Sequence, residues 1–168
     1  MSTLGGLVRI AALLPLVSAN ASVAQTHCTP SETVAFSCSL KAAKVVSLCL
    51  GHAQGQGSAP LSYRFGRLGK PEFVFPAPST GTSGTFRYAH YARYQVDRTE
   101  VSFSNAGVDH VVFDYREGGP NPSLSRGIRA TRNGKDIELN CKGRSVSRLL
   151  QLQPLLPCDA ENALASCN

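Results

Sequence analysis

The chain has 168 residues, 42% of them apolar, and its 17 lysines and arginines exceed its 11 aspartates and glutamates, for a formal net charge of +6. The basic residues are scattered, with no run of five and no interleaved aromatic cluster, so we expect no nucleic-acid partner. Such a charge can attract an acidic protein, an anionic polymer or a membrane surface, and it can equally be a solvated surface that binds nothing.

Residues 1–24 have the pattern of a secretory signal peptide. Arg9 supplies the positive charge, residues 10–17 form an apolar run, and Ala24 ends a small-x-small cleavage site. The run is shorter than the roughly 20 residues that span a bilayer; a buried N-terminal helix is the alternative. Cleavage leaves residues 25–168 as a single β-rich, disulfide-bonded domain, which we expect in the periplasm or outside the cell, with no stable membrane insertion.

All the cysteines lie in this mature part of the chain, and their number is even, which behind a signal peptide predicts a disulfide framework. No C-x-x-C motif occurs, so the signatures of a thioredoxin-like site and of a zinc ribbon are both missing. Six cysteines allow 15 pairings, among which spacing alone does not choose. The residues are Cys28, Cys38, Cys49, Cys141, Cys158 and Cys167.

The segment FSCSLKAAKVVSLCLG, residues 36–51, has the pattern of a hairpin. If its turn is centred on Ala43 and Lys44, Cys38 lies directly opposite Cys49. Opposed Cβ atoms are about 4.5–5.5 Å apart, close to the separation that a disulfide requires. The sequence therefore predicts a Cys38–Cys49 disulfide, with metal binding as the lesser alternative because no other ligand has suitable spacing.

Further strands follow, separated by turn residues. The alternation of apolar and polar residues over 86–96 indicates one strand with Phe86, Tyr88 and His90 on the same face. The other expected strands are 61–66 and 72–75, around a break at 67–70, and 101–103 and 111–113, around a turn at 105–107.

The clearest hairpin is IRATRNGKDIELNC, residues 128–141, because Asn133-Gly134 is a strong signal for a type I′ turn. The turn fixes the register, gives the hairpin one apolar face and points Cys141 inward on that face. The expected opposed pairs are Ile128 with Leu139, Ala130 with Ile137, and Arg129 with Glu138.

Residues 146–156 could form a short helix that ends at Pro154 or Pro157. The helix formers at 158–167, with Asp159 as N-cap, predict a second helical segment that would hold Cys158 and Cys167 apart. The pairings Cys28–Cys167 and Cys141–Cys158 are then favoured. With eight or nine short strands and little helix, we expect a mainly β protein, an antiparallel barrel or sandwich.

No catalytic motif is evident, and we expect no catalytic residue, metal or other cofactor. Five carboxylates gather in one hairpin region, where we expect them at solvent-facing strand ends; a glycosidase pair formed by two of them is the alternative. They are Asp97, Glu100, Asp109, Asp114 and Glu117. The histidines are far apart in sequence, and His90 is expected in the core or at its rim. Oxidised cysteines offer no thiol nucleophile.

The runs SCSLKAAKVVSLC and LSYRFGRLGKPEFVFP resemble a pattern in short exported proteins of Gram-negative bacteria, in which a cysteine-flanked hairpin precedes a Tyr-Arg-Phe-Gly strand and a Gly-Lys-Pro-Glu turn. The resemblance implies export and a β-fold and attaches no activity. A looser likeness is to periplasmic lysozyme inhibitors, which are small disulfide-bonded β-barrels. The chain lacks their Ser-Gly-x-x-Tyr signature, and its positive charge does not suit a basic lysozyme.

These features favour a non-catalytic periplasmic binding protein, such as an inhibitor or an immunity protein against a cell-envelope-directed toxin or hydrolase. Its partner would be a periplasmic or secreted protein with an acidic surface. We expect the binding residues to be Tyr63, Arg64, Arg67 and Lys70, because turns carry recognition and because arginine and tyrosine dominate interfaces. The alternatives are an envelope-glycan enzyme that uses a carboxylate pair, and a structural protein without a discrete ligand.

Overall fold

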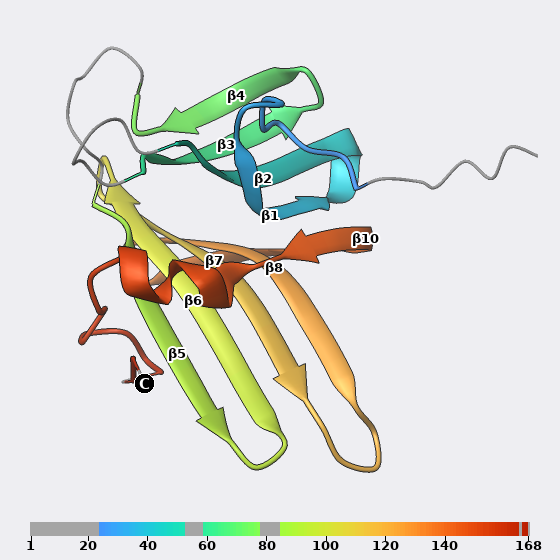
Figure 1. The fold of residues 1–168 in the computed structure, drawn as a ribbon, viewed down its shortest axis with the longest axis vertical. Coiled ribbons are helices and arrows are strands. Elements are labelled where there is room, and N and C mark those ends of the chain that lie inside the picture. Colours follow the sequence, from blue (N-terminus) through green and yellow to red (C-terminus); the bar gives the residue numbers. More distant parts are fainter. Residues whose placement is uncertain (1–23, 53–58, 78–84, 165, 168) are drawn as a thin grey trace, which may run out of the picture.

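The computed structural model describes residues 24–52, 59–77, 85–164 and 166–167, and this part of the chain forms two five-stranded antiparallel sheets (Figure 1). The first sheet has the order β10 (Lys142–Ser147), β1 (Thr33–Ser39), β2 (Lys44–Leu50), β3 (Leu61–Arg67) and β4 (Lys70–Phe75). The second has the order β5 (Arg87–Arg93), β6 (Val96–Asn105), β7 (Val108–Glu117), β8 (Ser123–Arg132) and β9 (Lys135–Asn140). The predicted signal peptide, apart from Ala24, lies outside the described residues.

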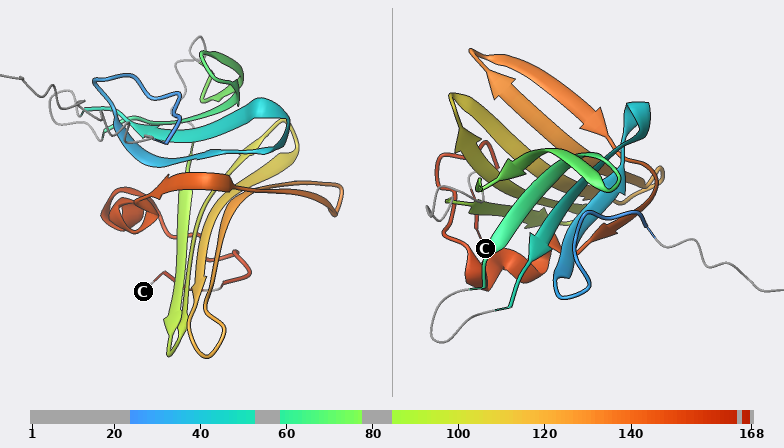
Figure 2. Two further views of the ribbon diagram at one scale, coloured as in Figure 1. Left: turned by 90° about the vertical axis from the view of Figure 1, so that its right-hand side faces the viewer. Right: turned by 90° about the horizontal axis from the view of Figure 1, so that it is seen from above.

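The two sheets pack face to face as a sandwich, and their strands cross rather than run parallel (Figures 1 and 2). The core between them holds apolar side chains from both, among them Phe36, Leu48, Tyr88 and Val101, all at most 1% exposed. The mainly β prediction is therefore confirmed, and the described residues contain ten strands rather than eight or nine.

The second sheet extends past the first, and the 3-10 helix that follows β10 covers the inner face there (Figure 2). After β10, a 3-10 helix, η2 (Leu149–Leu155), buries Leu149 and Leu152 against the core. The expected helix over 146–156 is thus shorter, and it continues through Pro154. Among the described residues, no helix is long and apolar enough to cross a membrane.

The β8–β9 hairpin has the predicted register: Ile128 opposes Leu139, Ala130 opposes Ile137, and Arg129 opposes Glu138. Both turn residues, Asn133 and Gly134, have positive φ, as a type I′ turn requires. Cys141 packs against the core, as expected.

The predicted register of the first hairpin is wrong. A short 3-10 turn, η1 (Lys41–Ala43), joins β1 to β2, and Cys38 lies opposite Val46 instead of Cys49. The register differs from the predicted one by three residues, and an odd shift moves side chains to the other face of the sheet. Cys38 therefore points into the core, while Cys49 points to the outer face.

All six cysteines are paired, but none of the three predicted pairings occurs. The disulfides are Cys28–Cys49, Cys38–Cys141 and Cys158–Cys167. Because Cys38 faces inward, it reaches Cys141 at the corner where the chain passes from β9 into β10 and changes sheets. On the outer face, Cys49 holds the N-terminal segment through Cys28.

The C-terminal segment 158–167 is not the predicted helix but wraps around the edge strand β5. The amide of His90 donates to the carbonyl of Ser166, and the amide of Asp159 donates to the carbonyl of Tyr88. The edge strand β5 has backbone groups that would stay unpaired if the C-terminal segment formed a separate helix. Pairing with β5 instead brings the Cα atoms of Cys158 and Cys167 within 5.7 Å of each other. Strand β5 also ends at Arg93, before the predicted limit of 96.

Candidate functional site

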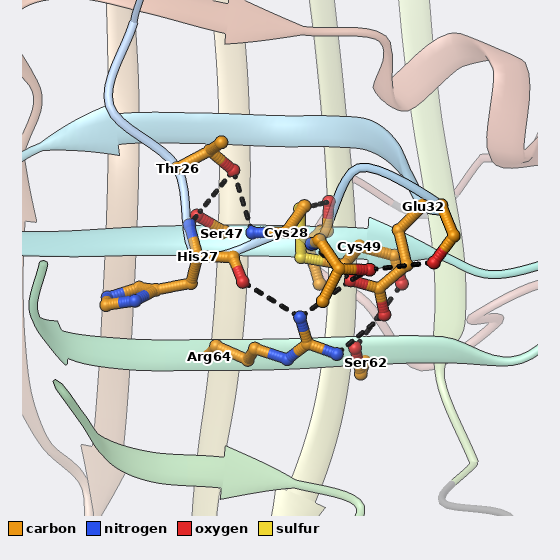
Figure 3. Close-up of polar contacts among 11 residues, drawn as sticks. Thr26, His27, Cys28, Glu32, Ser47, Cys49, Ser62 and Arg64 are labelled. Atoms are coloured by element: carbon orange, nitrogen blue, oxygen red, sulfur yellow. Dashed lines mark hydrogen bonds and ion pairs between the residues drawn. A yellow bond between two sulfur atoms is a disulfide. The ribbon is translucent and has the colours of Figure 1, made fainter. Parts of the chain in front are cut away.

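Of the four residues expected to bind a partner, two do not face solvent freely. Tyr63 points into the core with 3% of its surface exposed. Arg64, on the outer face of β3, forms a bidentate ion pair with Glu32, with N–O distances of 2.6 and 2.7 Å (Figure 3). The same guanidinium donates to the carbonyl of His27 at 2.9 Å.

Arg64 therefore holds the N-terminal segment against the first sheet. Hydrogen bonds from Arg64 lower the pKa of Glu32 below its ordinary value. The amide of His27 also donates to Ser47 Oγ at 2.9 Å, so the segment satisfies polar groups on the outer face (Figure 3). Arg67 and Lys70 flank the β3–β4 turn and are exposed. The four residues do not form one surface, and a binding role for Arg67 and Lys70 stays a prediction.

Glu100, the most deeply buried of the five carboxylates, is 2% exposed, so it is not the solvent-facing strand end that we expected. It accepts hydrogen bonds from Tyr115, from Arg129 at 2.9 Å and from Asn162 at 2.6 Å. Burial and the neighbouring Glu100 raise the pKa of Tyr115 to about 12. The C-terminal segment, which carries Asn162, thus covers the Glu100 carboxylate, and the three hydrogen bonds stabilise the negative charge of this carboxylate.

Asp114 is also buried, at 5% exposure, which again contradicts the expected solvent-facing position. It accepts from Arg116 at 3.2 Å and from Arg126 at 3.1 Å. Burial is the largest single effect and would raise the pKa of Asp114, but the hydrogen bonds from Arg126 and Ser147 and the charges of Arg126 and Arg116 together lower it. In the register of β6 and β7, Asp114 opposes Thr99 while Glu100 opposes Phe113, so the two buried carboxylates point to opposite faces.

The other three carboxylates are also engaged. Asp97 Oδ1 lies 3.1 Å from His90 Nε2, Glu117 pairs with Arg98, and Asp109 accepts from Ser104. Asp97 and Asp114 do share a cavity, but its volume of about 30 Å³ suits a water molecule. A sugar needs a far larger site. Asp97 and Glu117 also line an open cleft of about 690 Å³, which is large enough for a sugar. There each carboxylate has a basic partner, His90 for Asp97 and Arg98 for Glu117, so a glycosidase pair in this cleft stays a hypothesis.

The described residues give no support to a metal site. Within the described residues, the only close group of potential ligands is Cys28, Glu32 and Cys49. Its two sulfurs are bonded to each other, and Glu32 is bound by Arg64. No atom of this group is free to ligate an ion.

The strongest candidate site is an open cleft of about 260 Å³ between the two sheets, which we call the inter-sheet cleft. It lies between β3 and β4 on one side and β7, β8 and β9 on the other. Its lining is Tyr63, Phe65, Phe73, His110, Ile128, Arg129, Ala130, Ile137 and Leu139. Strands β4 and β9 are edges of their sheets, and Ile137 on β9 is 67% exposed.

Aromatic rings form one wall of the inter-sheet cleft. The His110 ring stacks against Phe73 and Phe103, with centroids 5.3 and 4.7 Å apart. Tyr63 lies 5.8 Å from Phe73 and 5.1 Å from Phe103. Phe75 continues the stack from Phe103 at 4.3 Å. Because each ring contacts several others, the wall is a rigid, preformed surface.

Two polar groups in this apolar cleft have no hydrogen-bond partner among the described residues. Burial alone raises the pKa of Tyr63, so its hydroxyl stays protonated. Burial lowers the pKa of His110, against a smaller opposing effect of Asp109, so its imidazole is neutral at pH 7. A ligand that covers these two groups without pairing with them would bury them unpaired, at a typical cost of about 1–3 kcal/mol each. A ligand that pairs with them avoids that cost.

The sequence indicated part of this site. The apolar face of the 128–141 hairpin supplies Ile128, Ala130, Ile137 and Leu139, and Tyr63 was among the expected binding residues. His110 was missed, because Tyr63 and Phe73, which it contacts across the cleft, come from strands that are distant from it in sequence.

Comparisons with protein families, with curated proteins and with solved structures found no significant match.

Proposed function

We propose that this protein is a non-catalytic, exported binding protein that holds an apolar group of a protein partner in the inter-sheet cleft. The observation that carries the proposal is the cleft itself: an aromatic wall, a volume of about 260 Å³ and an exposed Ile137 at its mouth. Concave apolar surfaces with a few polar groups are the usual form of a binding site.

The scaffold suits binding because it is preorganised. The Cys38–Cys141 disulfide ties the two sheets together at one corner, and Cys28–Cys49 fixes the N-terminal segment. A rigid site loses little conformational entropy when a partner binds. The cleft also lies between two sheet edges, β4 and β9, whose outer backbone groups pair with no described strand. Such edges can accept an extended segment of a partner.

Three disulfides indicate an oxidising, extracytoplasmic compartment. We place the protein in the periplasm, as an inhibitor or immunity protein against an envelope-directed toxin or hydrolase. The net charge of +6 favours a partner with an acidic surface. The engagement of all five candidate carboxylates supports binding over glycan hydrolysis.

The test is whether binding depends on the cleft. Ile137→Asp places a charge at its mouth, while Leu124→Asp changes a leucine that is 57% exposed on the same sheet and outside the cleft lining. We expect a fluorescent apolar probe, and a stoichiometric partner captured from envelope extract, to bind the unchanged protein and Leu124→Asp but not Ile137→Asp. Equal binding by all three proteins would show that the inter-sheet cleft is not the binding site and would refute the proposed function.

A further inference from the structure

We propose that the group taken by the inter-sheet cleft is the phenol of a tyrosine side chain on the partner. This inference rests on the proposed function and specifies its ligand. The ring would lie against the aromatic wall at Phe73, and its hydroxyl would pair with the Tyr63 hydroxyl and the His110 imidazole.

The size of the cleft favours one aromatic ring. A cavity of about 150 Å³ is enough to hold benzene, and this cleft measures about 260 Å³. A substituted ring therefore fits with room for its substituent. Ring contacts with Phe73 and Tyr63 also favour an aromatic group, because aromatic pairs attract each other beyond the area that they bury.

The polar groups that line the cleft favour a phenol over an unsubstituted aromatic ring. Tyr63 is 3% exposed, lines the cleft and has no hydrogen bond within the described part of the chain. His110, in its neutral form, offers one donor and one acceptor. A phenol can donate and accept at one oxygen, so it can pair with both groups. A phenylalanine or leucine side chain would bury them unpaired.

A charged anchor does not suit this lining. Arg129 is the one described lining residue that is charged at pH 7, and its guanidinium bonds Glu100 on the opposite face of the sheet. A lysine, arginine or carboxylate would thus enter an apolar cleft without a counter-charge, at a large desolvation cost. The tyrosine hydroxyl is neutral and avoids this cost.

The test compares p-cresol with toluene, which differ only in the hydroxyl. Both are titrated into the oxidised protein, with the NMR shifts of the Ile137 methyl groups and the His110 ring as readouts. We expect p-cresol to bind about tenfold more tightly, which corresponds to about 1.4 kcal/mol. Tyr63→Phe should reduce this ratio to about threefold or less, corresponding to about 0.65 kcal/mol or less. Tyr94→Phe, a change in a turn residue that is 87% exposed, should leave the ratio unchanged.

A third ligand, N-acetyl-tyrosine amide, distinguishes a partner's side chain from a free phenol. It should shift the same resonances, and its phenylalanine counterpart should bind more weakly. Selective binding of p-cresol without binding of the tyrosine amide would overturn the protein partner as the source. Equal binding of toluene and p-cresol would overturn the phenol and leave the proposed function standing. Failure of every ligand to shift the cleft resonances would overturn the proposed function as well.

Discussion

Two tyrosine hydroxyls in this protein have different environments, and removing each should have different consequences. The Tyr63 residue lines the inter-sheet cleft and its hydroxyl bonds no described residue, whereas the Tyr115 hydroxyl donates to the buried carboxylate of Glu100. Tyr63→Phe should therefore leave the free energy of unfolding within about 1 kcal/mol of its original value, because no hydrogen bond to a described residue is lost. Tyr115→Phe should lower it by about 1.5–3 kcal/mol, the worth of a hydrogen bond to a charged group.

Urea unfolding of the oxidised variants, followed by circular dichroism, measures both values. The pair is a matched control because each substitution removes the same atom from the same residue type. Glu100 keeps Arg129 and Asn162 as partners in Tyr115→Phe, so the loss should not exceed that of one bond. If Tyr63→Phe costs as much as Tyr115→Phe, the Tyr63 hydroxyl has a partner and is not available to a ligand.

Other expectations concern the disulfides and the N-terminal segment. Peptide mapping without reduction should find Cys38 joined to Cys141, and replacing both by alanine should cost up to about 4.7 kcal/mol on the chain-entropy estimate for a loop of this length. Arg64→Met should lower stability by about 1–3 kcal/mol at pH 7, because it removes the charged partner of the partly buried Glu32 and leaves it only its hydrogen bonds from Thr29. The folded-state pKa of Glu32 is lowered, so its contribution is complete above the ordinary pKa of 4.5 and is lost as pH falls through the folded-state pKa. Acid titration of stability should show this loss in the unchanged protein and a smaller one in Arg64→Met.

Local chemistry explains which parts of the fold could be predicted from sequence. The register of β8 and β9 follows from Asn133-Gly134, because few other dipeptides adopt two positive φ angles so readily. The first hairpin has no such signal. Its turn places Ala42 and Ala43 at positive φ, which nothing in their chemistry indicates, so the assumed centre of the turn was wrong and the disulfide prediction failed with it.

The C-terminal segment shows tertiary contacts overriding local propensity. Its residues favour a helix. Its backbone groups nevertheless form hydrogen bonds with the backbone of Tyr88 and His90 on the edge strand β5. The candidate site was hidden for a related reason. Tyr63 and His110 are 47 positions apart, and only the crossing of the two sheets brings their rings within 6.2 Å. The pattern of apolar and polar residues along the chain predicts which face of a strand is buried, but it does not predict which residues of two packed sheets contact each other.

The arrangement of covalent links also explains why the inter-sheet cleft lies where it does. Strand β9 carries the exposed Ile137 and leads to the corner at Cys141, where a disulfide joins the chain to β1. At the opposite edge of the first sheet, β4 contacts the second sheet through rings such as Phe73 and Phe75, with no disulfide. The disulfide fixes the two sheets at one corner, and the packed rings hold them at the other edge, so the cleft beside β4 is preformed and a ligand can enter it without disturbing the fold. The disulfide that the sequence could not assign thus supports the same site as the aromatic wall.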